Sequence, residues 1–112
     1  LTGRVGLDRQ FPESDGRSSD PLYHPENRVR VLDALAQIQE IADAHGSSLA
    51  NLAVAWVIHQ PGVTGALVGA RTSQQAVENA VAARISLHDD ELSAIRTVFE
   101  SVKINKRPGR AE

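Results

Sequence analysis

The chain has 112 residues, of which 41% are hydrophobic and 23% charged, as expected of one globular domain with its own core. A formal net charge of -2 and the lack of a recurring basic stripe give no electrostatic case for nucleic-acid binding. The absence of cysteine excludes disulfides and thiolate metal sites, and no apolar run reaches the roughly 20 residues that span a bilayer. We therefore expect a cytoplasmic domain that binds neither nucleic acid nor membrane.

Most of the turn-forming residues lie in positions 1–27, where no hydrophobic period is present, so the sequence predicts a long loop there. Apolar residues then recur at three- and four-residue spacing over residues 26–45, which predicts an amphipathic helix that Gly46 ends. A second helix begins at a serine and ends at Pro61-Gly62. It is apolar nearly all round, which predicts that other elements cover it on more than one side.

The next segment predicts a short strand. Residues 63–68, with Ala66 to Val68 at their centre, show no alternation of polar residues, which is typical of a strand buried on both faces of a parallel sheet. Two further helices are predicted, one beginning at Thr72 and one over residues 89–102. One strand cannot form a sheet, and the chain contains no methionine, so we expect it to be part of a longer protein.

The junction between the predicted strand and the third helix carries a ligand-binding pattern. A helix that begins directly after a strand and a glycine turn presents unpaired N–H groups and the positive end of its dipole to an anion, commonly phosphate. Arg71 lies on this turn, and helical spacing places it on one face with Gln75, Glu78 and Asn79. An arginine for a phosphate, beside amides and a carboxylate for ribose or base edges, suits an adenine nucleotide.

The same residues also have a structural interpretation. Residues 72–75 fit a capping box, in which Thr72 is the N-cap and Gln75 reaches back to the backbone N–H of the cap. Glu78 and Asn79 would then be solvated helix surface. Because the strand, the glycine turn and four polar groups on one face coincide, we favour the nucleotide phosphate site.

Residues 41–58 and 61–79 resemble the C-terminal part of the aldo-keto reductases, and Gly69-Ala-Arg-Thr-Ser-Gln-Gln-Ala-Val-Glu-Asn79 is the most specific stretch. The opening Leu1-Thr-Gly-Arg4 is similar to the segment after strand seven of their barrel, and residues 86–92 resemble their final helix. The family folds as an eight-stranded (β/α) barrel. The resemblance therefore implies an α/β fold, the C-terminal fragment of a TIM barrel that is mostly helical with one parallel strand. Its parts would be a cofactor-covering loop (1–27), a helix-helix-strand-helix-helix segment (28–102) and a tail (103–112).

Members of this family bind NADPH and usually transfer a hydride to an aldehyde or ketone carbonyl. The resemblance implies that Arg71 binds the adenosine 2′-phosphate and that Arg4 contacts the pyrophosphate. The other implied members of the cofactor site line the turn or touch the adenosine: Gly69, Ala70, Gln75, Glu78 and Asn79.

The family's catalytic tetrad of aspartate, tyrosine, lysine and histidine comes from its first four strands, and no position of this chain matches it. We therefore assign no catalytic and no metal-binding residue. We expect the complete protein, with the rest of the barrel, to be an NADP-dependent reductase of small carbonyl substrates, and this chain alone to be inactive. Two alternatives stay open: a nucleotide-sensing regulatory subunit of the same fold, and a helical interaction module without a ligand.

Overall fold

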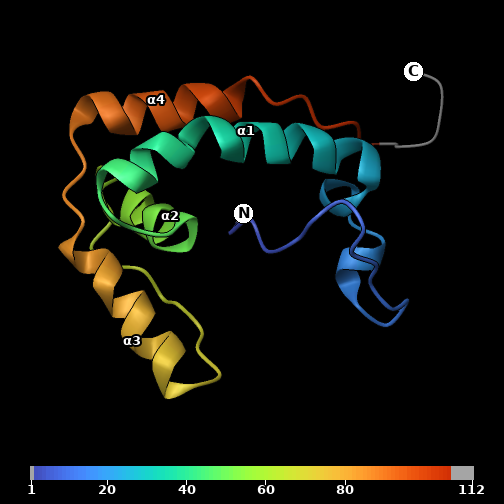
Figure 1. Cartoon of the computed structure of the whole chain (residues 1–112), viewed down its shortest axis with the longest axis horizontal. Helices are drawn as coiled ribbons and strands as arrows, with labels where there is room; N and C mark the ends of the chain where they lie inside the picture. Colours follow the sequence, from blue (N-terminus) through green and yellow to red (C-terminus); the bar gives the residue numbers. More distant parts are fainter. Residues whose placement is uncertain (1, 107–112) are drawn as a thin grey trace.

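A computed structural model describes residues 2–106, in which four α-helices are joined by loops and short 3-10 turns (Figure 1). Helices α1 and α4 lie side by side, α2 lies against them, and α3 projects away as an arm. The four predicted helices are confirmed, and each begins within two residues of the position expected. Their bounds are α1 Pro25–Ala44, α2 Leu49–Ile58, α3 Ser73–Val81 and α4 Asp89–Glu100, and the 3-10 turns are η1 Gly16–Ser18, η2 Pro21–Tyr23 and η3 Ala82–Arg84.

Local capping explains where the first two helices begin and end. Pro25 occupies the first turn of α1, where its missing N–H costs nothing, and His24 Nδ1 accepts the Glu26 N–H at 3.3 Å. Gly46 follows α1 with φ +60, the left-handed conformation that glycine adopts without steric penalty and that commonly ends a helix. Ser48 then begins α2, because its hydroxyl accepts the Asn51 N–H at 3.1 Å.

The core lies between α1, α2 and α4. Two fully buried alanines, Ala42 on α1 and Ala55 on α2, are 0% exposed and let the helices approach closely. Leu52 is 1% exposed, and the segment before α4 adds two buried side chains of its own. The buried cluster consists of Leu35, Ile38, Ala42, Leu52, Ala55, Ile85, Leu87 and Ile95.

Polar contacts fix α4 along α1 at both ends. At one end, His45 Nε2 lies 2.7 Å from Glu91 Oε2. Glu91 Oε1 accepts the His88 N–H at 3.1 Å, and this backbone hydrogen bond is the main reason that the pKa of Glu91 is lowered. At the other end, the buried Asn27 side chain binds both the N–H and the carbonyl of Asn105, at 2.9 and 2.8 Å. Residues 103–106 of the predicted tail are therefore held on α1, and residues 107–112 lie outside the described residues.

The predicted strand is absent. Residues 63–68 form no strand, and no β-strand occurs anywhere in residues 2–106, so the predicted α/β fold with one parallel strand is wrong for this chain. Leu67 is 107% exposed and Val68 is 43% exposed, although both were expected to be buried. A strand is stabilised by hydrogen bonds to a neighbouring strand, and no second extended segment of the described chain lies beside this one.

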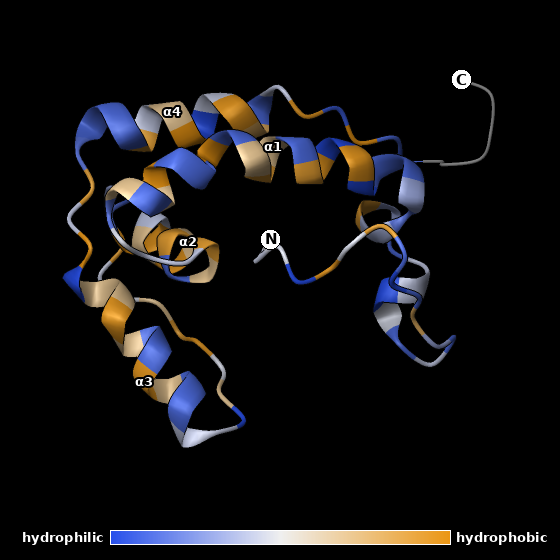
Figure 2. Ribbon diagram, in the orientation of Figure 1, coloured by the Kyte–Doolittle hydropathy of each residue, from blue (hydrophilic) through white to orange (hydrophobic). Residues whose placement is uncertain are grey.

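The side chains of the α3 arm are not enclosed by the rest of the chain, although the arm contacts α2. None of the residues of α3 is buried, and Val77 is 66% exposed. Hydrophobic and hydrophilic residues are interspersed along α3 (Figure 2). The expected cover of α2 is also incomplete, because Val57 is 41% exposed. The Cα radius of gyration is 15.3 Å, above the roughly 13 Å of a compact domain of this length. Within the described range, no helix has the length and apolar character needed to cross a bilayer.

Candidate functional site

The loop before α3 is held at its C-terminal end by the start of the helix. Thr72 is the N-cap, as predicted, and its hydroxyl accepts the Gln75 N–H at 3.1 Å. Gln75 does reach back, but its Oε1 accepts the N–H of Arg71 at 2.7 Å rather than that of the cap residue. The predicted capping box is therefore half correct, because the side chain of Gln75 extends one residue beyond the cap.

A second side chain of α3 contacts the same loop. Asn79 Nδ2 donates to the Gly69 carbonyl at 3.1 Å. Gln75 and Asn79 are both half-buried, whereas Gly69, Ala70 and Arg71 are exposed. The four-residue spacing predicted from the sequence thus places two amides against the loop backbone.

The charged residues of the predicted site remain at the surface. Glu78 is exposed and accepts a 3.4 Å contact from Gln74 Nε2 within the helix. The Arg71 guanidinium has no hydrogen bond or ion pair within residues 2–106. The backbone N–H groups of Ser73 and Gln74 also have no acceptor in this described part of the chain. The start of α3 therefore offers one guanidinium and two free N–H groups, a donor set that suits an anion.

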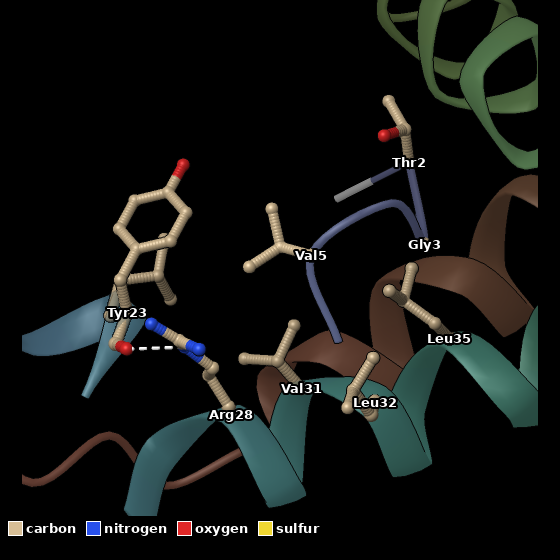
Figure 3. A pocket seen from close by; sticks show the side chains of 9 residues that line it. Thr2, Gly3, Val5, Tyr23, Arg28, Val31, Leu32 and Leu35 are labelled. Carbon is tan, nitrogen blue, oxygen red and sulfur yellow. Dashed lines mark hydrogen bonds between the residues drawn. The ribbon is translucent and has the colours of Figure 1, made fainter. Parts of the chain in front are cut away.

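Arg4 is not brought to this site. The N-terminal segment lies against α1, where Gly3 and Val5 line a small cavity of about 40 Å³ (Figure 3). Arg4 lies between these two lining residues in the chain and is exposed. The start of α3 lies at the far end of the arm (Figure 1). The structure thus gathers Gly69, Ala70, Arg71, Gln75, Glu78 and Asn79 and leaves Arg4 apart.

One residue that the sequence reasoning missed holds the N-terminal loop in place. Arg28 on α1 is only 7% exposed. Within residues 2–106 its guanidinium donates to backbone carbonyls alone, including those of Tyr23 (Figure 3) and of Gly6, the latter at 3.1 Å. Four such carbonyls converge on it: Gly6, Leu7, Arg9 and Tyr23. A signal was present in the sequence, because Arg28 lies four residues before Leu32 and therefore falls on the apolar stripe of α1.

The Phe11 ring of this loop lies beside three arginine side chains, two from the loop and one from α1. The guanidinium carbon of Arg17 lies 4.4 Å from the centroid of Phe11, and those of Arg9 and Arg28 lie 5.4 and 5.2 Å from it. Arg17 also donates to both carboxylate oxygens of Asp15, with Nη2 at 2.6 Å from Oδ2. No sequence periodicity indicated this cluster, because Arg9, Phe11 and Arg17 lie outside the α-helices, in the segment before α1.

The Asp15–Arg17 pair has a measurable consequence for pH dependence. Hydrogen bonds from the Arg17 side chain, and then from its backbone N–H, lower the pKa of the Asp15 carboxyl from 3.8 to about 2. A lowered pKa means that the contact stabilises the folded loop above pH 3.8 and is lost as the pH falls through about 2. We expect an NMR titration of the Asp15 carboxyl to give that midpoint, and Arg17→Gln to return it toward 3.8. A midpoint near 3.8 in the unchanged chain would contradict the pairing.

Comparison with known proteins identifies the family. The sequence model of the aldo/keto reductase family matches residues 1–100, so this chain belongs to that family, and the resemblance is confirmed. The chain is 28% identical over 104 residues to the aldo-keto reductase str7 of Strobilurus tenacellus, covering 93% of this chain and 31% of that protein. It is also 28% identical over 103 residues to the NADH-specific methylglyoxal reductase of Escherichia coli strain K12, covering 92% of this chain and 31% of that protein.

A third relative differs in the cofactor that its name specifies. The aldo-keto reductase yakc of Schizosaccharomyces pombe, whose name specifies NADP(+), is 28% identical over 104 residues, covering 93% of this chain and 31% of that protein. The chain thus spans about a third of the length of the relatives that it matches. Since one relative is named for NADH and another for NADP(+), membership of the family does not by itself fix the cofactor.

Proposed function

We propose that this chain supplies the adenosine-binding part of an oxidoreductase that uses NADPH to reduce a small aldehyde or ketone. The observation that carries the proposal is the exposed Arg71, whose guanidinium has no partner within residues 2–106 and which lies two residues before the first of the free N–H groups, those of Ser73 and Gln74. A permanently charged planar group beside a helix N-terminus favours a dianionic phosphate. The adenosine 2′-phosphate is the group that distinguishes NADPH from NADH.

The remaining side chains of the arm fit the adenosine end of this cofactor. Gln75 Nε2 and Asn79 Oδ1 have no hydrogen-bond partner among the described residues, so they offer one donor and one acceptor for a base or ribose edge. Bound NADPH would supply the hydride, while these residues bind and orient its adenosine end. The proposed site consists of Gly69, Ala70, Arg71, Gln75, Glu78 and Asn79. Arg4 is not included, because the N-terminal segment that carries it lies against α1, away from the start of α3.

A pair of small nucleotides tests this proposal on the 112-residue chain itself. The compound 2′,5′-ADP carries the 2′-phosphate, and 5′-AMP lacks only that group. We expect 2′,5′-ADP to shift the backbone NMR signals of Arg71, Ser73 and Gln74, and to do so less at high salt because exposed charges are screened. We expect 5′-AMP to leave these signals nearly unchanged.

Two results would contradict the proposal. Equal shifts with both nucleotides would mean that the 2′-phosphate is not recognised. If neither nucleotide changed any signal of the arm, the helical interaction module without a ligand would be favoured instead.

A further inference from the structure

We propose that Gln75 and Asn79 are positioning residues that clamp the loop of residues 69–71 along α3 before any nucleotide binds. The proposal rests on the proposed function for its purpose, because the clamped loop carries Arg71, but the contacts themselves need no ligand. In this arrangement the two amides act on the loop backbone, and Arg71 acts on the phosphate. We use the name amide clamp for two hydrogen bonds, from the Arg71 N–H to Gln75 Oε1 and from Asn79 Nδ2 to the Gly69 carbonyl.

The partners of the amide clamp fix the direction of each hydrogen bond. The Arg71 N–H can only donate, so the atom of Gln75 at 2.7 Å is its carbonyl oxygen. The Gly69 carbonyl can only accept, so the atom of Asn79 at 3.1 Å is its NH2 group. Amide orientations are otherwise ambiguous, but here the backbone settles them. Position 75 therefore needs an acceptor, and position 79 needs a donor.

The spacing of the amide clamp matches the geometry of a helix beside a chain. The four residue steps from Gln75 to Asn79 rise about 6 Å along the helix axis. The two residue steps from Gly69 to Arg71 span at most about 7 Å. The loop can thus run alongside α3 in the opposite direction, with Gly69 near Asn79 and Arg71 near Gln75. A single pair of side chains one turn apart is sufficient to hold it.

The chain immediately before the amide clamp lacks such contacts. Residues 64–68 are exposed, and none of their backbone groups forms a hydrogen bond with the rest of the described chain. Order in the loop must therefore come from α3 and not from the preceding segment. Because a loop ordered in advance loses less conformational freedom on binding, the amide clamp should favour capture of the phosphate.

Replacing each amide by the carboxylate of the same shape tests the acceptor role of Gln75 and the donor role of Asn79 separately. Gln75→Glu keeps the acceptor for Arg71, whereas Asn79→Asp removes the donor for Gly69 and sets a negative charge against a carbonyl. Both changes add the same charge, so each controls for the other. Gln75→Leu removes the acceptor. Gln74→Leu is its matched control one position away, because it keeps the backbone N–H of Gln74 and removes a side chain whose only hydrogen bond within residues 2–106 is to Glu78.

The readout is the backbone order parameter from NMR relaxation of the 112-residue chain. In the unchanged chain we expect about 0.85 for residues 69–71 and less than about 0.6 for residues 64–67. Gln75→Leu and Asn79→Asp should lower the values at 69–71 toward those at 64–67. Gln75→Glu and Gln74→Leu should leave them unchanged. Circular dichroism confirms that each variant retains its helices.

A nucleotide titration separates this proposal from the proposed function. We expect Gln75→Leu to weaken 2′,5′-ADP binding by roughly two- to tenfold relative to Gln74→Leu, as for the loss of one hydrogen bond. If the order parameters follow the expected pattern but the unchanged chain does not bind 2′,5′-ADP, the amide clamp is supported and the proposed function is wrong. If Gln75→Glu loosens the loop as much as Gln75→Leu, or Asn79→Asp leaves it ordered, the amide clamp is wrong whatever the titration gives.

Discussion

Replacing Arg71 by alanine is expected to weaken NADPH binding by roughly ten- to a hundredfold and to leave NADH binding nearly unchanged. A hydrogen bond to a charged group contributes about 1.5 to 3 kcal/mol, and about 1.4 kcal/mol corresponds to a factor of ten in affinity. Because NADH lacks the 2′-phosphate, it loses no such contact. Dissociation constants of both cofactors for the unchanged chain and the variant, measured by fluorescence or calorimetry, test this expectation.

Arg84 provides a matched control for this experiment. It is exposed and lies in η3, directly after α3, so Arg84→Ala removes the same charge from the other end of the arm. We expect Arg84→Ala to leave the preference for NADPH unchanged. If Arg71→Ala weakened NADH as much as NADPH, or if both variants lost NADPH affinity equally, the assignment of Arg71 to the 2′-phosphate would be wrong.

The largest expected loss of stability comes from Leu52→Ala. Leu52 is 1% exposed within the core cluster, and truncating a buried leucine lowers the free energy of unfolding by about 2 to 5 kcal/mol. Leu67→Ala makes the same chemical change at a side chain that is 107% exposed, and we expect it to alter this free energy by less than about 0.5 kcal/mol. Urea unfolding followed by circular dichroism measures both. Similar losses for the two variants would contradict the exposed position of Leu67.

The helices were predictable because their signals are local. Ser48 and Thr72 begin α2 and α3 by hydrogen-bonding groups three residues away, and Gly46 ends α1 through its own backbone conformation. Such contacts depend only on neighbouring residues, so the local sequence is sufficient to predict them. The apolar spacing over residues 26–45 identified the buried face of α1 for the same reason.

The presence of a strand could not be predicted from local sequence, because a strand depends on a neighbouring strand elsewhere in the chain. Residues 63–68 have an apolar composition that suits a buried strand, but no partner segment lies beside them in residues 2–106.

The candidate site was predictable from the sequence only in part. Helical spacing correctly placed Gln75 and Asn79 on a face that meets the loop, but which backbone groups they bind depends on the path of that loop.

The exposed loop before α3 also determines how the chain would respond to a protease. Arg71 is an exposed arginine outside the helices, so the peptide bond that follows it is a site that trypsin recognises. A nick there would divide the polypeptide into an N-terminal piece with α1 and α2 and a C-terminal piece with α3 and α4. The two pieces would remain associated without a covalent link, because α4 lies along α1 and Asn27 binds the backbone of Asn105. The structure thus divides into two complementary halves at the residue that we propose to bind the phosphate.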